Sequence, residues 1–503
     1  MKRRLFPVFC AIVALCTTCC LTAFAQKIYR HSWYVDTTGS DGAGNGYRNK
    51  PFKTINRINV VALHPGDTVY FRAGQIFDGT LELRAGLSGS AKNPIVITSY
   101  GKGRATINGG DSSAVRIYKE SHVKLEHLTL KGSGRKTGNV KDGLAIINCR
   151  DVHVNDLDIW GFQKSGLLIY SSQNIVAHDV SAHDNGSAGI TVESPYQKRE
   201  SHNIKILHCR AENNPGDPTN LTNHSGNGIV VGNCRKVLID HCTATNNGWD
   251  MPRIGNGPVG IWAYEADSVT IQHCLSYKNK TSKGGADGGG FDLDGGVTHS
   301  IVQYNVSYDN WGSGYCIFQY WGASPWHDNI FRYNISENDG TVSDSQAGLY
   351  VWNSSDDEKQ FHDCLVYGNI IYNDKVAALC YSEKSESKGI RYLYNVFVGK
   401  DSLMKGKDKI GDARYVGNNW WSIDKGFSMN GVKDFKEWQK SHFYVIGDIS
   451  PYETNIKPEF SDPGNTAITS ADQLKNLKNY DLNEGSRFRK TIGYKRGISK
   501  IKL

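Results

Sequence analysis

Residues 204–214, 237–247 and 269–279 read IKILHCRAENN, VLIDHCTATNN and VTIQHCLSYKN. Each segment has a short apolar run, a His-Cys pair, a second short run and a turn that ends in Asn. The anchor positions follow one another at intervals of 33, 32, 31 and 29 residues, and they are Cys209, Cys242, Cys274, Asn305 and Asn334. A period of this length indicates supersecondary units that stack on one another.

A further strand-forming run follows the turn of each unit and begins with glycine. These runs read GLLIYSS, GITVESP, GIVVGN, GIWAYE, GFDLDGG, GYCIFQY and GLYVWNS. Short strands at this period predict a parallel β-solenoid, in which coils stack about 4.8 Å apart and equivalent residues form ladders. Because cysteines on successive coils point the same way, we expect buried free thiols and not disulfides. We interpret the neighbouring His208, His241 and His273 as a column on the outer face and not as a metal site.

The pattern over residues 33–400 resembles the right-handed parallel β-helix family of secreted carbohydrate-active enzymes, which has the pectin-lyase-like fold. YVDTTGSDGAGNGYRNKPFKTINRINVVALHPGDTVYFRAG (34–74) is similar to the entry segment of such proteins, in which an amphipathic helix, here near 51–63, caps the open end. NPIVITSYGKGRATINGG (93–110) resembles their first full coil. The resemblance implies an all-β fold and a glycoside hydrolase or polysaccharide lyase, although the same fold also carries epimerases and adhesins.

The ends of the chain differ from the repeats. Residues 1–25 have the features of a cleaved signal peptide: a basic start, an apolar run to about Leu21 and a cleavage motif ending at Ala25. We therefore expect a secreted or periplasmic protein without a membrane span, and Cys19 and Cys20 fit a lipoprotein anchor poorly. We assign residues 26–400 to the capped β-helix and residues 401–503 to a C-terminal cap or extension, with a short helix in VKDFKEWQKSH (432–442).

The composition indicates which class of molecule the protein binds. The formal net charge of +8 is mild for 503 residues, and no long Lys/Arg run indicates nucleic-acid binding. The 11 Trp and 26 Tyr residues are typical of proteins that stack rings on sugars, although core packing also uses them. We expect a monomer that binds a polysaccharide or oligosaccharide.

Insertions in four successive repeats point to one groove. They fall between the Asn turn and the following strand, at residues 214–227, 248–258, 279–289 and 339–346. Insertions in repeat proteins tend to map to one face, which is often the binding face. Strand alternation places two outward columns beside this groove. The first column contains Leu168, Thr191, Val230, Trp262, Asp292, Cys316 and Tyr350. The second column contains Tyr170, Glu193, Gly232, Tyr264, Asp294, Phe318 and Trp352.

The run GGADGGGFDLDGG (284–296) carries the candidate catalytic residues. Phe291 and Leu293 face the core, so Asp292 and Asp294 face solvent as an acid and base pair, with Asp287 assisting from the loop. Their backbone spacing of about 6.6 Å slightly favours an inverting glycosidase. The expected substrate-binding residues are Trp262, Tyr264, Glu265, Phe318, Tyr350, Trp352 and Trp321.

Two other functions remain open. Asp- and Gly-rich loops also bind Ca²⁺, and the segment has some resemblance to family-9 pectate lyases, so the alternative is a Ca²⁺-dependent lyase of a uronic-acid polymer. In that family a lysine base occupies the position near Asp294, and the next coil carries an Asp pair that NWGSGY (310–315) lacks. A hydrolase requires no cofactor. The third hypothesis is a non-catalytic glycan-binding solenoid.

Overall fold

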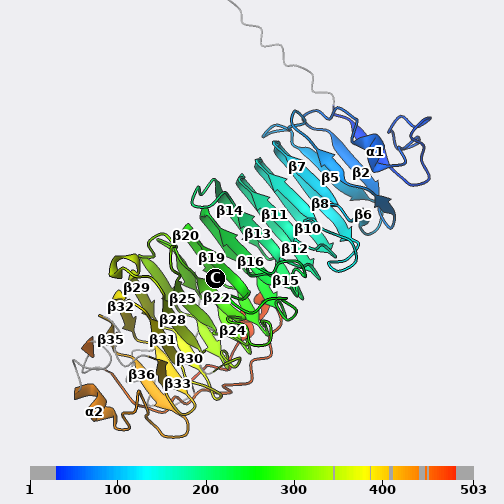
Figure 1. Cartoon of the computed structure of the whole chain (residues 1–503). Coiled ribbons are helices and arrows are strands. Elements are labelled where there is room, and N and C mark those ends of the chain that lie inside the picture. Colours follow the sequence, from blue (N-terminus) through cyan, green and yellow to red (C-terminus); the bar gives the residue numbers. More distant parts are fainter. Residues whose placement is uncertain are drawn as a thin grey trace, which may run out of the picture.

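A computed structural model describes residues 30–343, 346–385, 387–406, 412–440, 448–449 and 453–482. Its strands pair in parallel and wind into an elongated solenoid, with α1 (Ile55–Ile58) near one end and α2 (Phe435–Lys440) at the other (Figure 1). The parallel β-helix predicted from the repeat is therefore confirmed. The expected signal peptide lies outside the described residues.

Two sheets account for the described strands. The 12-stranded sheet has one strand per coil, namely β4 (Leu81–Leu83), β7 (Val115–Tyr118), β9 (Leu144–Ile147), β11 (Ser165–Tyr170), β13 (Ala188–Glu193), β16 (Asn227–Gly232), β19 (Val259–Tyr264), β22 (Gly289–Leu293), β25 (Tyr315–Gln319), β28 (Leu349–Asn353), β31 (Leu379–Glu383) and β34 (Met404–Gly406). The 25-stranded sheet contains β1 (Ser32–Val35), β2 (Thr68–Arg72), β3 (Ile76–Asp78), β5 (Ile95–Tyr100), β6 (Ala105–Gly110), β8 (Ser121–Gly132), β10 (Arg150–Trp160), β12 (Gln173–His183), β14 (Ser201–Leu207), β15 (Arg210–Glu212), β17 (Cys234–Asp240), β18 (Thr243–Thr245), β20 (Asp267–Gln272), β21 (Leu275–Tyr277), β23 (Ile301–Gln303), β24 (Val306–Tyr308), β26 (Asn329–Arg332), β27 (Ile335–Glu337), β29 (His362–Tyr367), β30 (Ile370–Tyr372), β32 (Lys388–Leu393), β33 (Val396–Gly399), β35 (Arg414–Val416), β36 (Asn419–Ser422) and β37 (Asp448–Ile449).

A left-handed residue bends each coil of the larger sheet. His208, His241 and His273 have φ values of 52°, 54° and 50°, and Tyr304 and Tyr333 occupy the same place on the next two coils. The rings form a column, with centroids 4.8 Å apart for His208 and His241 and 4.9 Å apart for His241 and His273. The outer His column predicted from the repeat is therefore confirmed.

The residue after each bend points into the core and joins the coils. Cys209, Cys242 and Cys274 are buried and free, so the expected thiols are confirmed at these positions. Asn305 continues the column, and its Oδ1 accepts the Cys274 N–H at 2.8 Å. Its Nδ2 donates to the Ile271 carbonyl at 2.9 Å. A column of asparagines thus satisfies backbone groups that the bend leaves outside the strand ladder.

The N-terminal cap is smaller than expected. The helix α1 covers Ile55–Ile58 only, and the side chain of Thr54 accepts the Arg57 N–H at its start. The chain then turns because the Asn59 side chain pairs with the first strand edge: Nδ2 donates to the Thr80 carbonyl at 2.9 Å, and Oδ1 accepts the Glu82 N–H at 3.0 Å. These bonds cover an otherwise open edge.

The C-terminal part extends the solenoid and then returns along it. The strands β34, β35 and β36 continue the parallel ladder past residue 400, the boundary that the repeat pattern indicated. The expected helix is α2, and its Trp438 is fully buried. Residues 453–482 run back to the middle of the molecule, where Ala471 N–H donates to Thr243 Oγ1 at 2.9 Å (Figure 1).

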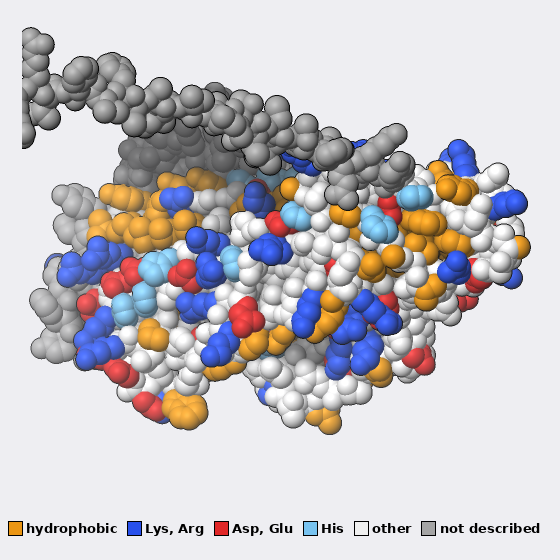
Figure 2. Space-filling model, turned by 90° about the horizontal axis from the view of Figure 1, so that it is seen from above, with side chains coloured by type: hydrophobic (Ala, Val, Ile, Leu, Met, Phe, Trp, Pro, Cys, Tyr) orange, Lys and Arg blue, Asp and Glu red, His pale blue; other side chains and the backbone are white. Residues whose placement is uncertain are grey.

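The surface carries mixed charges. On the face shown in Figure 2, lysine and arginine side chains lie in separate groups among acidic, histidine and uncharged side chains. In the part of the chain that the structure describes, no helix combines the length and apolar character needed to cross a bilayer.

Candidate functional site

The outer face of the 12-stranded sheet carries the first predicted column in the predicted register. Trp262 pairs with Asp292, Asp292 with Cys316, and Cys316 with Tyr350. Phe291 and Leu293 are fully buried on the inner face. The Asp294 N–H donates to the Ala263 carbonyl at 2.8 Å, so the strand geometry continues one residue beyond β22. Asp292 and Asp294 therefore lie on the same outer face.

Asp292 is on this face but is enclosed. Only 2 % of the residue is exposed, and its ladder neighbours Trp262 and Cys316 are 4 % and 1 % exposed. Its Oδ1 has no hydrogen-bond partner among the described residues. The expectation of a solvent-exposed carboxylate is therefore wrong for Asp292, because its neighbours along the column exclude water from it.

Asp287 and Asp294 are partly exposed. Asp294 Oδ1 accepts the N–H of Gly295 at 2.7 Å. Asp287 has a left-handed backbone, with φ at 64°, and its Oδ2 accepts the Gly257 N–H at 2.7 Å. This bond ties the inserted loop 279–289 to the loop 248–258 of the preceding coil. The predicted loop carboxylate thus has a fixed position beside the strand pair.

Burial raises the proton affinity of all three carboxylates. Burial holds the pKa of Asp292 well above its usual range, and the charges of Asp294 and then Asp287 add to this shift. Burial, together with the charges of Asp287 and Glu265, raises the pKa of Asp294 to about 7 despite the Gly295 N–H. Burial likewise raises the pKa of Asp287 to about 6, against the effect of the Gly257 N–H. Asp287 and Asp294 therefore titrate close to neutral pH, and burial favours the protonated form of Asp292.

The aromatic residues predicted to bind sugar differ in exposure. Trp262, Phe318 and Tyr350 are 4 %, 5 % and 8 % exposed, so they wall the carboxylates more than they offer free ring faces. Phe318 packs edge-on against Tyr350 and Trp352, with centroid distances of 5.0 and 5.6 Å. Tyr264 and Trp352 are partly exposed. Of the aromatic residues in the two columns, Tyr264 and Trp352 are therefore the ones that a ligand can contact.

Trp321 is the most exposed of the predicted residues, at 71 %. Its backbone N–H donates to Ser354 Oγ at 2.9 Å, and its Nε1 donates to Asp356 Oδ2 at 3.1 Å. Tyr196, 54 % exposed, reaches the same loop because its hydroxyl contacts the Gly322 carbonyl at 3.5 Å. The two exposed rings are typical of a sugar-stacking platform.

Glu265 is fully buried, and its hydrogen bonds hold a neighbouring loop in position. Its Oε1 accepts the Ser324 N–H at 2.8 Å and the Tyr196 hydroxyl at 3.2 Å. The carboxylate therefore anchors the loop that carries Trp321, and its charge contributes to the raised pKa of Asp294. It lies near the site, as expected, without direct access to solvent.

A cavity of about 260 Å³ lies on the same sheet, next to the coils before β22. It is lined by Asp142, Lys164, Ser165, Ser187, Ala188, Thr191, Glu193, His224, Asn227, Val230 and Tyr264. Burial raises the pKa of Asp142 to about 6, and burial also raises the pKa of Glu193. A small cavity with several polar groups is typical of a pocket that orients a polar ligand.

Sequence reasoning missed most of this cavity. Glu193 is in the second outward column, three coils before Asp294. The structure connects the two regions because the Tyr264 hydroxyl reaches Glu193 Oε2 across Gly232. A Cβ at Gly232 would lie 2.3 Å from the Tyr264 ring, so glycine is required there. Asp142 directly precedes the glycine that begins the repeated strand. Ser165, Ala188 and Asn227 have the same position on later coils, so the repeat alignment could have identified Asp142 as a lining residue.

The parallel ladder and the carboxylate-lined outer face define the chain as a right-handed parallel β-helix protein. Residues 33–339 match the family described as Pel9A-like, right handed beta helix region. Since this match covers more than half of the 503 residues, the chain belongs to that family.

Two known proteins are similar to this chain at low sequence identity. The lacto-N-biosidase of Bifidobacterium longum subsp. longum is 22 % identical over 74 % of this chain, and the chain spans 29 % of that protein's length. The crystal structure of the GH136 lacto-N-biosidase from Eubacterium ramulus superposes with a TM-score of 0.52 and 19 % identity. That superposition covers 72 % of this chain and 67 % of the other. This second likeness establishes the common fold.

Proposed function

We propose that the chain is a secreted or periplasmic glycoside hydrolase that cleaves an oligosaccharide or polysaccharide on the outer face of the 12-stranded sheet. The observation that carries this proposal is the convergence of Asp287, Asp292 and Asp294, whose proton affinities are raised to different extents. Hydrolysis of a glycosidic bond needs one carboxylic acid and one carboxylate, held in environments that separate their pKa values. The lacto-N-biosidase relatives support a glycosidase and suggest the first substrate to test.

We base the proposed role of each carboxylate on its exposure and its pKa. Asp294 is partly exposed and has the higher pKa of the two accessible groups, so it is the general acid that protonates the leaving oxygen. Asp287 is partly exposed with the lower pKa, so it is the general base that activates water. Asp292 is enclosed, and burial favours its protonated form, which limits the negative charge beside the other two. This assignment exchanges the roles first expected for Asp292 and Asp287.

The neighbouring residues provide a place for the sugar. Tyr264 borders both the cavity and the carboxylate column, so a glycan can extend from one to the other. Trp321 and Trp352 offer ring surface for C–H contacts on the other side. The enclosed Trp262, Phe318 and Tyr350 keep water away from Asp292, and this dry surrounding strengthens the electrostatic effect of nearby charges.

The direct test is hydrolysis by the purified chain of a chromogenic lacto-N-bioside and of a panel of polysaccharides. We expect new reducing ends without the ultraviolet absorbance of unsaturated uronides, and activity that survives a chelator. The absorbing product, lost in chelator, would establish the lyase instead. Glycan binding without turnover on the whole panel would favour the non-catalytic solenoid.

The lyase alternative rests on the same carboxylates. Asp287, Asp292 and Asp294 offer oxygen ligands that suit Ca²⁺, and the unpartnered Asp292 Oδ1 is chemically suitable as one of them. A bound calcium would supply charge to acidify a uronic-acid carbon. The lysine of the cavity, Lys164, is ion-paired with Asp217, which weakens its candidacy as the required base.

The pH dependence of kcat/KM should be bell-shaped. Activity requires Asp287 without its proton and Asp294 with its proton, so it rises as pH passes about 6 and falls as pH passes about 7. The measurement is the initial rate at low substrate concentration between pH 4 and 9. The Asp287→Asn variant should lose the acidic limb together with most of the rate. An unchanged acidic limb in its residual activity would remove Asp287 from the role of base.

A further inference from the structure

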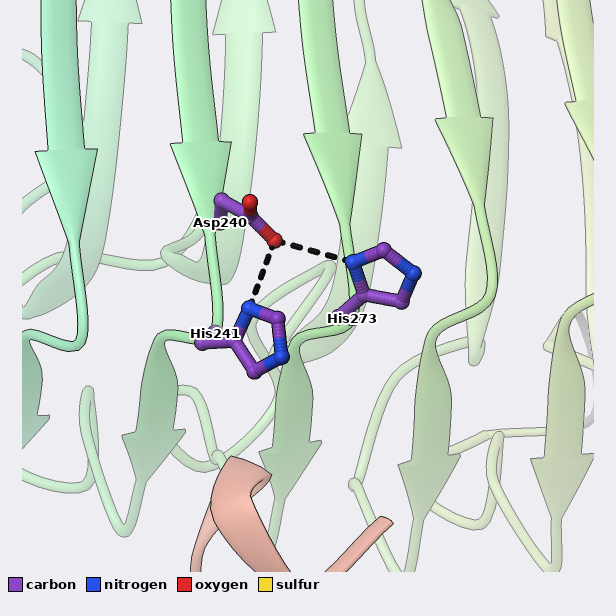
Figure 3. A group of neighbouring side chains, drawn as sticks. All are labelled: Asp240, His241 and His273. Atoms are coloured by element: carbon purple, nitrogen blue, oxygen red, sulfur yellow. Dashed lines mark hydrogen bonds and ion pairs between the residues drawn. The ribbon is translucent and has the colours of Figure 1, made fainter. Parts of the chain in front are cut away.

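Asp240, His241 and His273 meet at the bends of two neighbouring coils of the 25-stranded sheet. Asp240 ends β17 and His241 follows it, whereas His273 follows β20 on the next coil. Figure 3 shows both rings turned with one nitrogen toward the same carboxylate oxygen. The group is on a different sheet from β22, and the proposed hydrolysis does not use it.

The geometry of the group is convergent. Asp240 Oδ1 lies 2.8 Å from His241 Nδ1 and 2.9 Å from His273 Nδ1. One potential ligand atom from each residue lies within 4.8 Å of the other two. The side chains are 21 %, 21 % and 16 % exposed, so an ion could reach them from solvent.

The surroundings hold these three side chains in place. The amide of Gln272 donates to Asp240 Oδ2 at 3.2 Å, which leaves Oδ1 directed at the rings. His208 stacks on His241 with centroids 4.8 Å apart, and Tyr304 stacks on His273 at 5.5 Å. Ligating carboxylates in protein metal sites are commonly hydrogen-bonded in this way.

We propose that Asp240, His241 and His273 bind one divalent transition-metal ion, with Zn²⁺ as the probe. Two imidazole nitrogens and one carboxylate oxygen form a ligand set that suits Zn²⁺ and leaves a fourth position for water. The ion replaces the hydrogens now shared between Oδ1 and the two Nδ1 atoms. Each neutral ring then carries its proton on Nε2, which makes no hydrogen bond to protein within the described residues.

The required rearrangement is small. In a tetrahedral site with bonds of about 2.0–2.1 Å, ligand atoms lie about 3.3 Å apart. The present N···O distances of 2.8 and 2.9 Å therefore need to open by about half an ångström each. Because His273 is on the coil after Asp240 and His241, the bound ion joins two coils that the backbone ladder already pairs.

The test is calorimetric titration of the untagged full chain, stripped with EDTA and dialysed, with ZnCl₂. We expect one Zn²⁺ per chain, and at least a 30-fold loss of affinity in both His273→Gln and Asp240→Asn. Asparagine keeps an oxygen that can accept the ring hydrogens, so the second variant preserves the metal-free arrangement. Thermal unfolding without metal verifies that both variants fold, and only the wild type should gain thermal stability on adding Zn²⁺.

Two control variants separate this site from its neighbours. His202→Gln changes a histidine on β14 that lies outside the group and should change the affinity less than threefold. His327→Gln alters a second, more exposed group formed by His299, His327 and Asp328, and should leave the titration unchanged. Zinc binding lost in His327→Gln but retained in His273→Gln would overturn the proposal, as would the absence of saturable binding by the wild type.

Discussion

Asp294→Asn is expected to lower kcat by about 10²–10⁴-fold with little change in KM, because a general acid contributes about that factor. Asparagine has the shape of the protonated aspartic acid but cannot release a proton to the leaving oxygen. The substrate therefore binds as before, whereas the bond-breaking step loses its proton donor. The measurement is steady-state kinetics on whichever substrate the wild type hydrolyses.

Asp292→Asn distinguishes the present role assignment from the strand pair expected from sequence. Since burial favours the protonated form of Asp292, its amide should lower kcat less than tenfold. The matched control is Asp179→Asn, whose carboxylate is 54 % exposed beside His178 and outside the groove, and it should retain full activity. A loss in Asp292→Asn as large as in Asp294→Asn would make Asp292 a direct partner in catalysis. Full activity in Asp287→Asn and Asp294→Asn would place the site elsewhere.

The period of the sequence predicts the fold and the columns because both depend on local strand alternation. Phe291 and Leu293 had to face the core, and Asp292 had to stack between Trp262 and Cys316, once the register was known. The same reasoning correctly predicted that Cys209, Cys242 and Cys274 form no disulfides. The alternation of side chains along a strand, together with the number of residues in each coil, is sufficient for these conclusions.

The enclosure of the site could not be predicted in this way, because it depends on contacts between loops of different coils. The Ala286 N–H donates to the Gly255 carbonyl at 2.9 Å, and Gly288 N–H donates to the Pro258 carbonyl at 2.8 Å. These bonds join two insertions that have no common sequence pattern. The contact of Tyr264 with Glu193 across Gly232 is equally hard to predict from sequence, because the Tyr264 side chain spans two coils.

Asn305→Ala is expected to lower the free energy of unfolding by about 3–5 kcal/mol, because each buried polar group left unpaired costs about 1–3 kcal/mol. The substitution removes the acceptor of the Cys274 N–H and the donor to the Ile271 carbonyl, and both are buried at the bend. It also interrupts a column of asparagines that continues through Asn334, whose Oδ1 accepts from the Asn305 amide at 3.1 Å. The measurement is the urea transition followed by tryptophan fluorescence.

Cysteine occupies the position of Asn305 on the preceding coils, so Asn305→Cys is the conservative variant for this prediction. At the same bend one coil earlier, the Cys242 N–H donates to the sulfur of Cys274 at 3.3 Å, so a thiol can accept the bond that alanine cannot. Asn305→Cys should therefore destabilise the chain by at least about 1 kcal/mol less than Asn305→Ala. The exposed Asn155→Ala should change stability by less than about 0.5 kcal/mol. Equal destabilisation by alanine and cysteine at position 305 would mean that filling the bend, and not its hydrogen bonds, stabilises the stacked coils.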